Sequence, residues 1–403
     1  MRLRVGIVLG WLLLGAAPAL AEPYFAVREG LRCSACHTNM NGGGKRTDLV
    51  TTHARELLHY SPTLLGSFSN PPEFLSGEIN QYFALGADLR ASETATFQDL
   101  GSPSRCPPSS GGQSTTNCVS NNDVFRGRLE TNSIDVTEAV LYGEFRLIPD
   151  TLILYVDQRL QPQTNNREAF ALLKLPWYGT YFKAGQMFLP YGLQLQDDGA
   201  FIRGGTNGSA TTGFSFNVDQ PAFEIGTEPG PFTFVTAVSQ GAENDRDVQV
   251  TMTATALITE LPVVRNVLAG FSFSRVGPPG SQTTVFGPHI GTNYERLTVL
   301  GEADFRDDKN AQTNGQTIGR FICYGEADYL FLGWLNFKVA IDYSDNDGTL
   351  GDTNDAENRV RLGFEPFLNR FVQPRLFYSV SNGVETNPTH NQNVLLAELH
   401  VFF

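Results

Sequence analysis

The feature that most constrains the fold of this chain is a period-two alternation of side chains, which recurs from about residue 77 to the C-terminus. In "LNFKVAIDYS" (335–344) every odd-numbered residue is apolar or aromatic, and most residues between them are polar. "NVLLAELHVFF" (393–403) alternates in the same way around Glu398 and His400. Such segments predict half-buried β-strands. Because a soluble antiparallel sheet alternates too, the choice of a membrane barrel needs further observations.

The lengths of the connections between these strands favour a transmembrane barrel. In outer-membrane barrels, short turns gather at one rim and long loops at the other. Seven short turns and eight longer loops join 16 strands, an even number, and return the C-terminus to the short-turn rim. The expected short turns lie at 148–151, 177–180, 228–231, 260–265, 290–293, 331–334 and 366–370, and the longer connections include 92–123, 241–247, 306–316, 344–358 and 382–392.

Charged residues gather on the side of these strands that is opposite the apolar side. We expect this side to line a polar lumen and the apolar side to face lipid. Cys323 shares the apolar side with Phe321 and Tyr329, so it is predicted to be a packing thiol that faces lipid rather than a ligand. The charged residues expected in the lumen are Arg146, Asp157, Arg159, Glu302, Asp304, Arg320, Glu326, Asp328, Arg359, Arg361 and Arg375.

The two ends of the chain predict export to an outer membrane. Arg2 and Arg4, an apolar run and a small-x-small site at Ala19 and Ala21 predict a signal peptide at residues 1–21. The alternative, an N-terminal membrane anchor, needs about 20 apolar residues without such a site. No helix-length apolar segment follows the signal peptide. The aromatic C-terminus, Phe403, resembles the signal that outer-membrane proteins present for insertion.

Charge and cysteine content fit this compartment. Without the signal peptide the chain has 27 basic and 42 acidic residues, a net charge of −15 that disfavours nucleic acid as a partner. Five cysteines are expected in an oxidising environment. Cys106 and Cys118 bracket the turn-rich "PPSSGGQSTTN", and we predict that they form a disulfide across this loop.

The most specific motif is "CSACH" at residues 33–37, which has the Cys-x-x-Cys-His spacing of covalent c-type haem attachment. Cys33 and Cys36 are expected to form the thioethers of one haem c, and His37 to be the proximal ligand of the iron. The alternative is half of a zinc site, but such a site needs further Cys or His at ligand spacing. The other cysteines lie far away, so haem is preferred.

The second axial ligand of this haem is less constrained by the sequence. Residues 47–60 are predicted to form a short helix on which His53 shares a face with Leu49 and Leu57. His53 is the first candidate for the distal ligand, followed by His59 and by Met40, which lies only three residues after His37. A five-coordinate haem, with His53 outside the iron's coordination shell, stays open. Glycines 42–44 are expected to let the chain turn tightly against the haem edge.

The size of the segment before the first strand bears on its location. About 55 residues lie between Glu22 and the first strand, close to the lower limit at which a chain buries its own core. A haem on so short a segment needs shelter, and a 16-stranded barrel has a lumen that must be filled or conduct. We therefore expect residues 22–76 to lie in or below the barrel of residues 77–403, on the periplasmic side.

The order of these parts resembles the fused monohaem cytochrome–porins of bacterial outer membranes, whose best-known members oxidise iron. The resemblance rests on "CSACH" and on the architecture of the whole chain. It implies electron transfer from an extracellular donor such as ferrous iron to a periplasmic c-type cytochrome, as an iron:cytochrome c oxidoreductase. The sequence after the motif, "NMNGGGKRTDL", lacks the Phe-Gly-containing stretch of iron-oxidising members.

A transport function is the alternative. "YFKAGQMFLPYGLQLQDDGAFIR" (181–203) is similar to the Gly-Gln-x-x-x-Pro-x-Gly region of polyanion-selective porins, although a strand followed by a loop folded into the lumen is the preferred explanation of it. On this hypothesis the barrel is a diffusion porin, and the haem segment is a structural or redox-sensing plug.

Overall fold

A computed structural model describes residues 23–47, 49, 77–98, 128–161, 164–195, 200–203, 212–214, 219–241, 247–278, 281–309, 317–345, 356–368, 371–382 and 392–402. The expected signal peptide, His53, His59 and the predicted Cys106–Cys118 disulfide lie outside these residues. None of the helices in the described ranges is long and apolar enough to cross a membrane.

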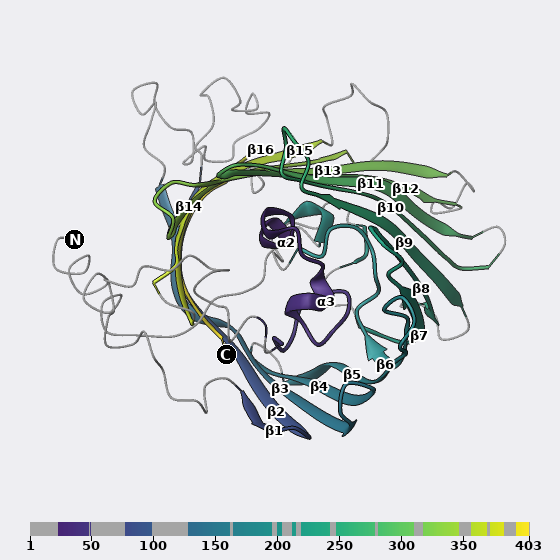
Figure 1. Ribbon diagram of the computed structural model, residues 1–403. Helices are drawn as coiled ribbons and strands as arrows, with labels where there is room; N and C mark the ends of the chain where they lie inside the picture. The colour runs from purple at the N-terminus through teal and green to yellow at the C-terminus, as the bar shows by residue number, and fades with distance from the viewer. Residues whose placement is uncertain are drawn as a thin grey trace.

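The described strands form a closed antiparallel barrel (Figure 1). Strands β2 to β17 pair with their sequence neighbours, and β17 pairs with β2 to close a ring of 16 strands. The short strand β1 is an addition that pairs with β2. This confirms the predicted β class, strand number and antiparallel order. Closure leaves no unpaired sheet edge, which a strand in lipid could not tolerate.

Each strand is seven to 21 residues long, apart from β1. The strands are β1 (Glu78–Asn80), β2 (Phe83–Gln98), β3 (Arg128–Ile148), β4 (Leu152–Gln161), β5 (Asn165–Lys174), β6 (Tyr181–Met187), β7 (Gln220–Thr227), β8 (Phe232–Gln240), β9 (Val248–Thr259), β10 (Asn266–Val276), β11 (Thr283–Tyr294), β12 (Leu297–Asp308), β13 (Ile318–Leu330), β14 (Leu335–Asp345), β15 (Glu357–Pro366), β16 (Val372–Asn382) and β17 (Gln392–Phe402). Two short helices, α2 (Pro23–Glu29) and α3 (Cys33–Cys36), and a 3-10 turn, η4 (Phe201–Arg203), complete the described elements.

Six of the seven expected short turns fall between strands, but the turn expected at 290–293 is wrong. These residues continue β11 to Tyr294, and the turn is made by Glu295 and Arg296, with Glu295 at a positive φ of 51°. Gly291 and Asn293 had suggested a turn, yet both serve other contacts. A Cβ at Gly291 would lie 2.8 Å from Val27 of α2, and Asn293 Nδ2 donates to Thr298 Oγ1 at 3.1 Å.

The outer surface of the barrel is apolar and carries aromatic rings towards both rims. Trp177, Tyr178 and Phe331 are more than half exposed at the short-turn rim. A row of neighbouring rings crosses β11 to β14 near the long-loop ends, with centroids 5.2 to 6.1 Å apart; its members are Phe286, Phe305, Phe321 and Tyr343. Two aromatic belts around an apolar band suit a bilayer.

Charged side chains line the inner face, as the alternation predicted. Asp157, Glu302 and Asp328 are at most 3% exposed, whereas Cys323 alternates with them on the outer face. Many of the lumenal charges are paired across strands, for example Arg359 Nη2 with Asp342 Oδ2 at 2.9 Å. The lumen is therefore polar and cross-linked by ion pairs.

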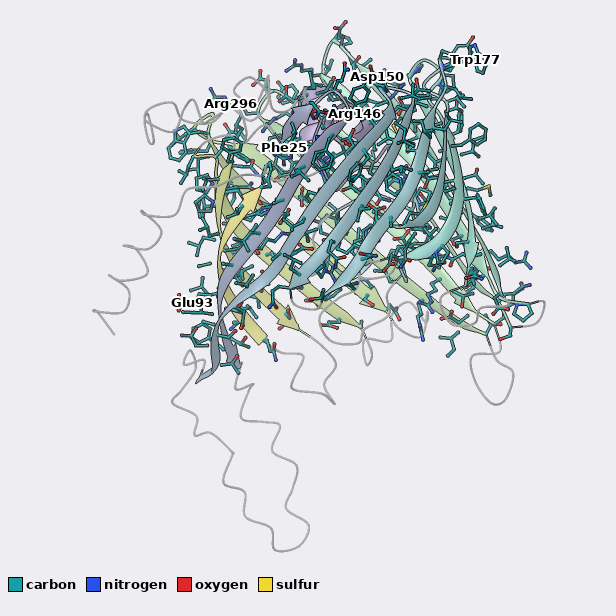
Figure 2. All side chains as sticks on the ribbon, turned by 90° about the horizontal axis from the view of Figure 1, so that it is seen from below. Phe25, Glu93, Arg146, Asp150, Trp177 and Arg296 are labelled. Atoms are coloured by element: carbon teal, nitrogen blue, oxygen red, sulfur yellow. The ribbon has the colours of Figure 1, made fainter. Side chains whose placement is uncertain are left out.

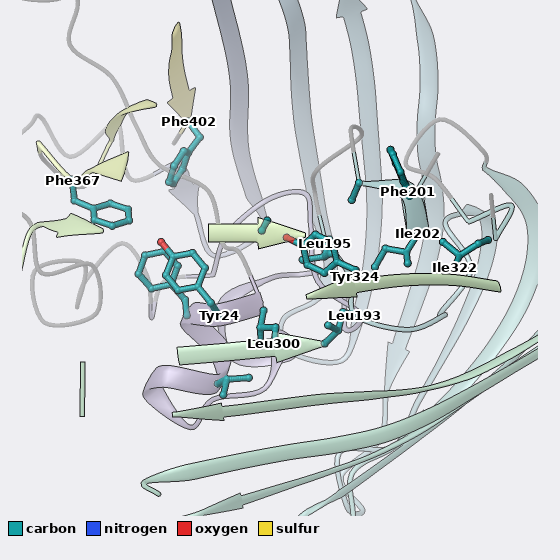
Figure 3. Close-up of a cluster of buried hydrophobic side chains, with 14 residues drawn as sticks. Tyr24, Leu193, Leu195, Phe201, Ile202, Leu300, Ile322, Tyr324, Phe367 and Phe402 are labelled. Atoms are coloured by element: carbon teal, nitrogen blue, oxygen red, sulfur yellow. The ribbon is translucent and has the colours of Figure 1, made fainter. Parts of the chain in front are cut away.

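An apolar cluster also lies inside the barrel, between the wall and two segments that enter the lumen (Figure 3). Tyr24, Phe25 and Val27 come from α2, and Leu193 and Phe201 come from the segment after β6. The wall contributes Leu300, Ile322, Tyr324, Ala340, Phe367 and Phe402. The hydrophobic core of this protein thus sits in the lumen and holds the N-terminal segment against strands of the wall.

Candidate functional site

Residues 23–47, which we call the lumenal segment, lie inside the ring of strands near the short-turn end. Figure 1 shows α2 and α3 within the ring, and Figure 2 shows Phe25 at the same end as Asp150, Trp177 and Arg296, opposite Glu93. Helix α2 contacts β10, β11 and β12. The described part of the Cys-x-x-Cys-His region is therefore enclosed by the barrel.

Helix α2 is seated on the wall by apolar packing and by its C-terminus. Phe25 packs edge-on against Phe367, with ring centroids 5.2 Å apart. Gly30, with φ of 66°, ends the helix, and Leu31 N donates to Ala26 O at 2.9 Å. This is the arrangement of a Schellman motif, in which a glycine in the left-handed region follows the helix. Asn266 Nδ2 of β10 donates to Val27 O and Arg28 O, both at 2.9 Å, and satisfies the last carbonyls.

The Cys-x-x-Cys turn follows directly and is tied to the barrel rim. His37 N donates to Cys33 O at 3.0 Å, which closes the single turn of α3. Glu228, in the short turn between β7 and β8, accepts from Arg32 Nη1 at 3.0 Å and from Ser34 Oγ at 2.9 Å. These bonds fix the residues on both sides of Cys33. Both thiols of the motif are partly exposed and free, as is Cys323.

A glycine turn brings the chain back beside His37. Gly42, Gly43 and Gly44 all have positive φ, between 65° and 95°, a region that costs residues with a Cβ roughly 1–2 kcal/mol. The turn pairs His37 with Arg46 in an antiparallel bridge. The expected tight turn at these glycines is confirmed, while its relation to a haem edge stays a prediction.

Polar side chains between His37 and the glycine turn bind carboxylates of the wall. Thr38 Oγ1 donates to Glu144 Oε2 at 2.8 Å, and Asn39 Nδ2 donates to Glu168 Oε2 at 3.0 Å. Asn41 Nδ2 donates to Glu224 Oε1 at 2.9 Å. Because these three carboxylates lie on β3, β5 and β7, the segment is held by a wide arc of the barrel. Sequence reasoning placed acidic residues in the lumen but did not single out these three.

The electrostatics around the motif favour uncharged side chains. Burial, together with the nearby Arg46 guanidinium, lowers the pKa of His37 to about 3, although the backbone of Gly44 and Gly43 acts in the opposite direction. Burial, with Cys36 and Glu228 adding to it, raises the pKa of the Cys33 thiol to about 11, and burial also raises that of Cys36. The motif is thus built from a neutral imidazole and two neutral thiols.

These residues fit a covalently attached haem by their chemistry. His37 is 3% exposed, and its Nδ1 atom makes no hydrogen bond to any described residue. A neutral, buried imidazole next to two free thiols is the donor set that c-type attachment needs. Within the described residues, no group of three or more His, Cys, Asp or Glu side chains is arranged to hold a metal ion by itself.

A cavity of about 110 Å³ adjoins the motif. Cys33 and Met40 line it on the side of the lumenal segment, and its apolar wall includes Leu193, Val235 and Leu268. Ligand pockets usually measure ~300–1,000 Å³, so a haem needs side chains around this cavity to move. The residues therefore fit haem by donor chemistry, and by volume only after local rearrangement.

The segment after β6 folds into the lumen beside this cavity, as the second explanation of residues 181–203 expected. Tyr191 Oη donates to Asp304 Oδ1 at 2.8 Å, and Leu193 N donates to Glu302 Oε2 at 2.6 Å. Arg203 Nη2 lies 3.0 Å from Glu302 Oε2, and both side chains are at most 2% exposed. This inward segment therefore occupies part of the lumen beside the cavity that Cys33 lines.

Comparison with known proteins identifies the architecture. No protein-family model matches the chain, and no curated protein matches its sequence. Among solved structures, a loop-deletion form of OmpT of Vibrio cholerae has a TM-score of 0.53 and 12% identity over 80% of this chain and 99% of that one. The anion-selective porin of Comamonas acidovorans has a TM-score of 0.53 and 10% identity over 80% and 99%.

OmpF of Salmonella typhi, solved with daunomycin, has a TM-score of 0.52 and 11% identity over 81% of this chain and 99% of that one. At such identities the likeness concerns the fold. It supports the outer-membrane location that the alternation and the C-terminal aromatic residue predicted. The part of each porin that matches is nearly its whole length, whereas about a fifth of this chain has no counterpart. The chain therefore has the fold of the outer-membrane porins.

Proposed function

We propose that this protein transfers electrons across the bacterial outer membrane through one haem c attached to Cys33 and Cys36 inside its porin-like barrel. In this proposal His37 is the proximal iron ligand, an extracellular donor such as ferrous iron supplies the electron, and a periplasmic c-type cytochrome accepts it. The observation that carries the proposal is the Cys-x-x-Cys-His turn, which lies in the lumen with free thiols and a buried, neutral imidazole.

The residues around the turn have defined roles in this proposal. A bound haem supplies one-electron redox chemistry. Glu228 holds the residues on both sides of Cys33, and Asn266 holds the end of α2 that precedes them. Asn39 and Asn41 fix the residues before the glycine turn on Glu168 and Glu224. The apolar side chains of the cavity exclude water, and the closed barrel carries the segment within the membrane. The short-turn end, where the segment lies, is the periplasmic end in barrels of this fold.

The decisive experiment uses liposomes that contain the full-length protein and enclose oxidised cytochrome c. Ferrous iron is added outside, and the absorbance of the enclosed cytochrome c is followed. We expect its reduction with the native protein. Replacement of both thiols, Cys33→Ser with Cys36→Ser, should abolish covalent haem staining and slow the reduction at least tenfold.

Ferrous iron that diffuses through an open barrel would also reduce the enclosed cytochrome c, and the variant without Cys33 and Cys36 measures this contribution. A second variant controls for the loss of a thiol as such. Cys323→Ser removes a free thiol on the outer face of the barrel and should change neither staining nor rate. If the variant without Cys33 and Cys36 reduces cytochrome c as fast as the native protein, ferrous iron passes through the pore and the electron-transfer proposal is wrong.

A diffusion porin is the second candidate, and the structural likeness to general and anion-selective porins favours it. In this function the lumenal segment regulates a pore that solutes cross. Liposome swelling in isosmotic solutions of sugars and of organic anions tests it. Swelling at the rate of a general porin supports the pore, and the absence of swelling together with haem-dependent reduction supports the conduit.

A further inference from the structure

We propose that Arg46, in the lumenal segment, binds a carboxylate group that the described residues do not supply. Two sources share this chemistry. One is a propionate of the haem, which rests on the proposed function, and the other is an organic anion in the lumen, which rests on the diffusion-porin alternative. The inference gives a residue outside the Cys-x-x-Cys-His motif a role in binding an anion beside it.

The first observation is a buried guanidinium without a carboxylate partner. Arg46 is 6% exposed, and its Nη2 atom is buried and makes no hydrogen bond to any described residue. The contacts of its side chain with described residues include no ion pair with a carboxylate. An arginine side chain keeps its charge in proteins, and a buried charge without a partner is costly. An anion at this position would remove that cost.

The other three basic residues of the lumenal segment are paired. Arg28 and Lys45 are about as buried as Arg46, yet each has a carboxylate within hydrogen-bond distance. The missing partner is therefore a property of Arg46 and not of the segment as a whole. The ion pairs are Arg28–Glu29, Arg32–Glu228 and Lys45–Glu78, with nitrogen-to-oxygen distances of 2.9 to 3.0 Å.

The described neighbours of Arg46 do not replace such a carboxylate. Asp88 of β2 acts on Arg46 electrostatically, but its oxygens lie 3.2 Å from His400 Nε2 and 3.6 Å from Arg90 Nε. The guanidinium carbon of Arg46 lies 3.1 Å from the centroid of the Phe402 ring. An aromatic face attracts a cation, but it does not supply the oxygen acceptors that the N–H groups of a guanidinium need.

The second observation is the position of Arg46 beside the motif. Arg46 pairs with His37 in the antiparallel bridge, and Thr47 N donates to Cys36 O at 3.0 Å. Side chains of directly paired residues lie on the same side of an antiparallel pair. The guanidinium therefore accompanies the two residues that would hold the iron and the porphyrin in the proposed function. Haem has propionates at one edge, and a planar guanidinium binds a carboxylate through two parallel hydrogen bonds.

The first arm of the test uses the full-length, haem-loaded protein in detergent, with haem content measured separately. Resonance Raman spectroscopy follows the bending mode of the haem propionates, and a redox titration gives the midpoint potential. Arg46→Gln should shift the propionate mode and lower the potential, because a positive charge near the iron favours reduced haem. Arg28→Gln removes a positive charge that already has a partner in the same segment, and it should leave the propionate mode unchanged.

A conservative variant covers the case in which Arg46→Gln fails to fold. Arg46→Lys keeps the positive charge but loses the planar fork of donors that binds a carboxylate through two hydrogen bonds. It should therefore shift the propionate mode while the midpoint potential stays close to the native value. A residue with a structural role alone would not produce this combination.

The second arm uses the full-length variant without the attachment thiols, Cys33→Ser with Cys36→Ser, which holds no covalent haem. Titration calorimetry with succinate measures carboxylate binding by this variant in detergent. If the carboxylate comes from a solute, the addition of Arg46→Gln should weaken succinate binding at least tenfold. The addition of Arg28→Gln should leave the binding unchanged.

The outcomes separate the two sources from each other and from the proposed function. A shifted propionate mode in the Arg46 variants assigns the carboxylate to the haem, and succinate binding that depends on Arg46 without such a shift assigns it to a solute. A native propionate mode in both Arg46 variants, together with no Arg46-dependent binding of succinate, overturns the inference and leaves the proposed function intact. A native protein without covalent haem refutes the proposed function, and the succinate arm then decides the inference.

Discussion

Single residues decide how closely the lumenal segment approaches the barrel wall. Gly291 of β11 lies under Val27 of α2, where even one methyl group would come within 2.8 Å. A glycine here therefore serves the docking of α2 rather than a turn.

Gly291→Val should loosen α2 from the wall while the barrel stays closed. Overpacking of this kind costs typically ~1–3 kcal/mol. In detergent, trypsin should cleave at Arg28 or Arg32 several-fold faster than in the native protein, with unchanged heat-modifiable migration of the barrel. Gly325→Val, at a site where an added Cβ meets nothing within 4 Å, is the control. Equal cleavage rates for the two variants would refute the contact.

A second prediction at the residue scale concerns the alkylation rate of the Cys33 thiol, in protein produced without haem attachment. The pKa of Cys33 is raised from 9.0 to about 11 by burial. Only the thiolate reacts, so alkylation by iodoacetamide at pH 8 should be roughly a hundredfold slower than for an unperturbed thiol. The rate should rise about tenfold per pH unit until the pH approaches 11, and mass spectrometry of peptides containing Cys33 measures it. A rate that levels off near pH 9 would contradict the shift.

At the scale of elements, the glycine turn and strands β5 to β7 form one polar unit. Lys183 Nζ of β6 lies 3.1 Å from Glu224 Oε1 of β7 and donates to Asn39 Oδ1 of the lumenal segment at 3.2 Å. Lys183 and Glu224 have no exposed side-chain surface. One cation thus links two strands to the segment that carries the motif.

Lys183→Met should destabilise this unit strongly, because it leaves the buried carboxylate of Glu224 without its cationic partner. Breaking a buried pair costs about 3–5 kcal/mol. The transition temperature for loss of heat-modifiable migration should fall, and proteolysis of residues 23–47 should accelerate. The double variant with Glu224→Gln should recover part of the loss, and Lys309→Met at an exposed position should match the native protein. A double variant no better than the single one would show that the carboxylate is not the source of the cost.

At the scale of the whole molecule, the described residues place two inward segments and their apolar core in the lumen. The lumenal segment contacts β10 to β12, and η4 contacts β13 and β14. A 16-stranded barrel has room for a channel, so the flow of ions depends on what these segments leave open.

Deletion of residues 23–47 should raise the ion conductance of the protein in planar bilayers several-fold, because it removes the buried side chains of α2 and the glycine turn from the lumen. Single-channel recording measures it, and heat-modifiable migration confirms that the barrel has formed. A variant that lacks the same number of residues from the long connection at 99–127 is the control and should conduct like the native protein. Equal conductance after both deletions would mean that the lumenal segment does not limit the pore.

Local sequence patterns predicted most of the barrel, and the reason is physical. Successive residues of a strand face lipid and lumen in turn, so the alternation in 335–344 alone assigns Lys338 and Asp342 to the inside, where the structure has them. The Cys-x-x-Cys-His spacing also identified Cys33, Cys36 and His37 as candidate haem-binding residues, because two thiols and an imidazole at this spacing are the donor set of c-type haem attachment. Both predictions are independent of which strands are neighbours in the barrel.

The strands, their two faces and the haem-type motif could be predicted from the amino-acid order, since each follows from residues close together in the chain. The contents of the lumen could not, because they depend on contacts that form in the folded barrel. Gly291 suggested a turn because its partner, Val27, is distant in the chain. The cavity beside Cys33 could not be predicted because it is assembled from α2, β9, β10 and the segment after β6. Contacts between remote residues form only when the barrel closes, and local periodicity carries no information about them.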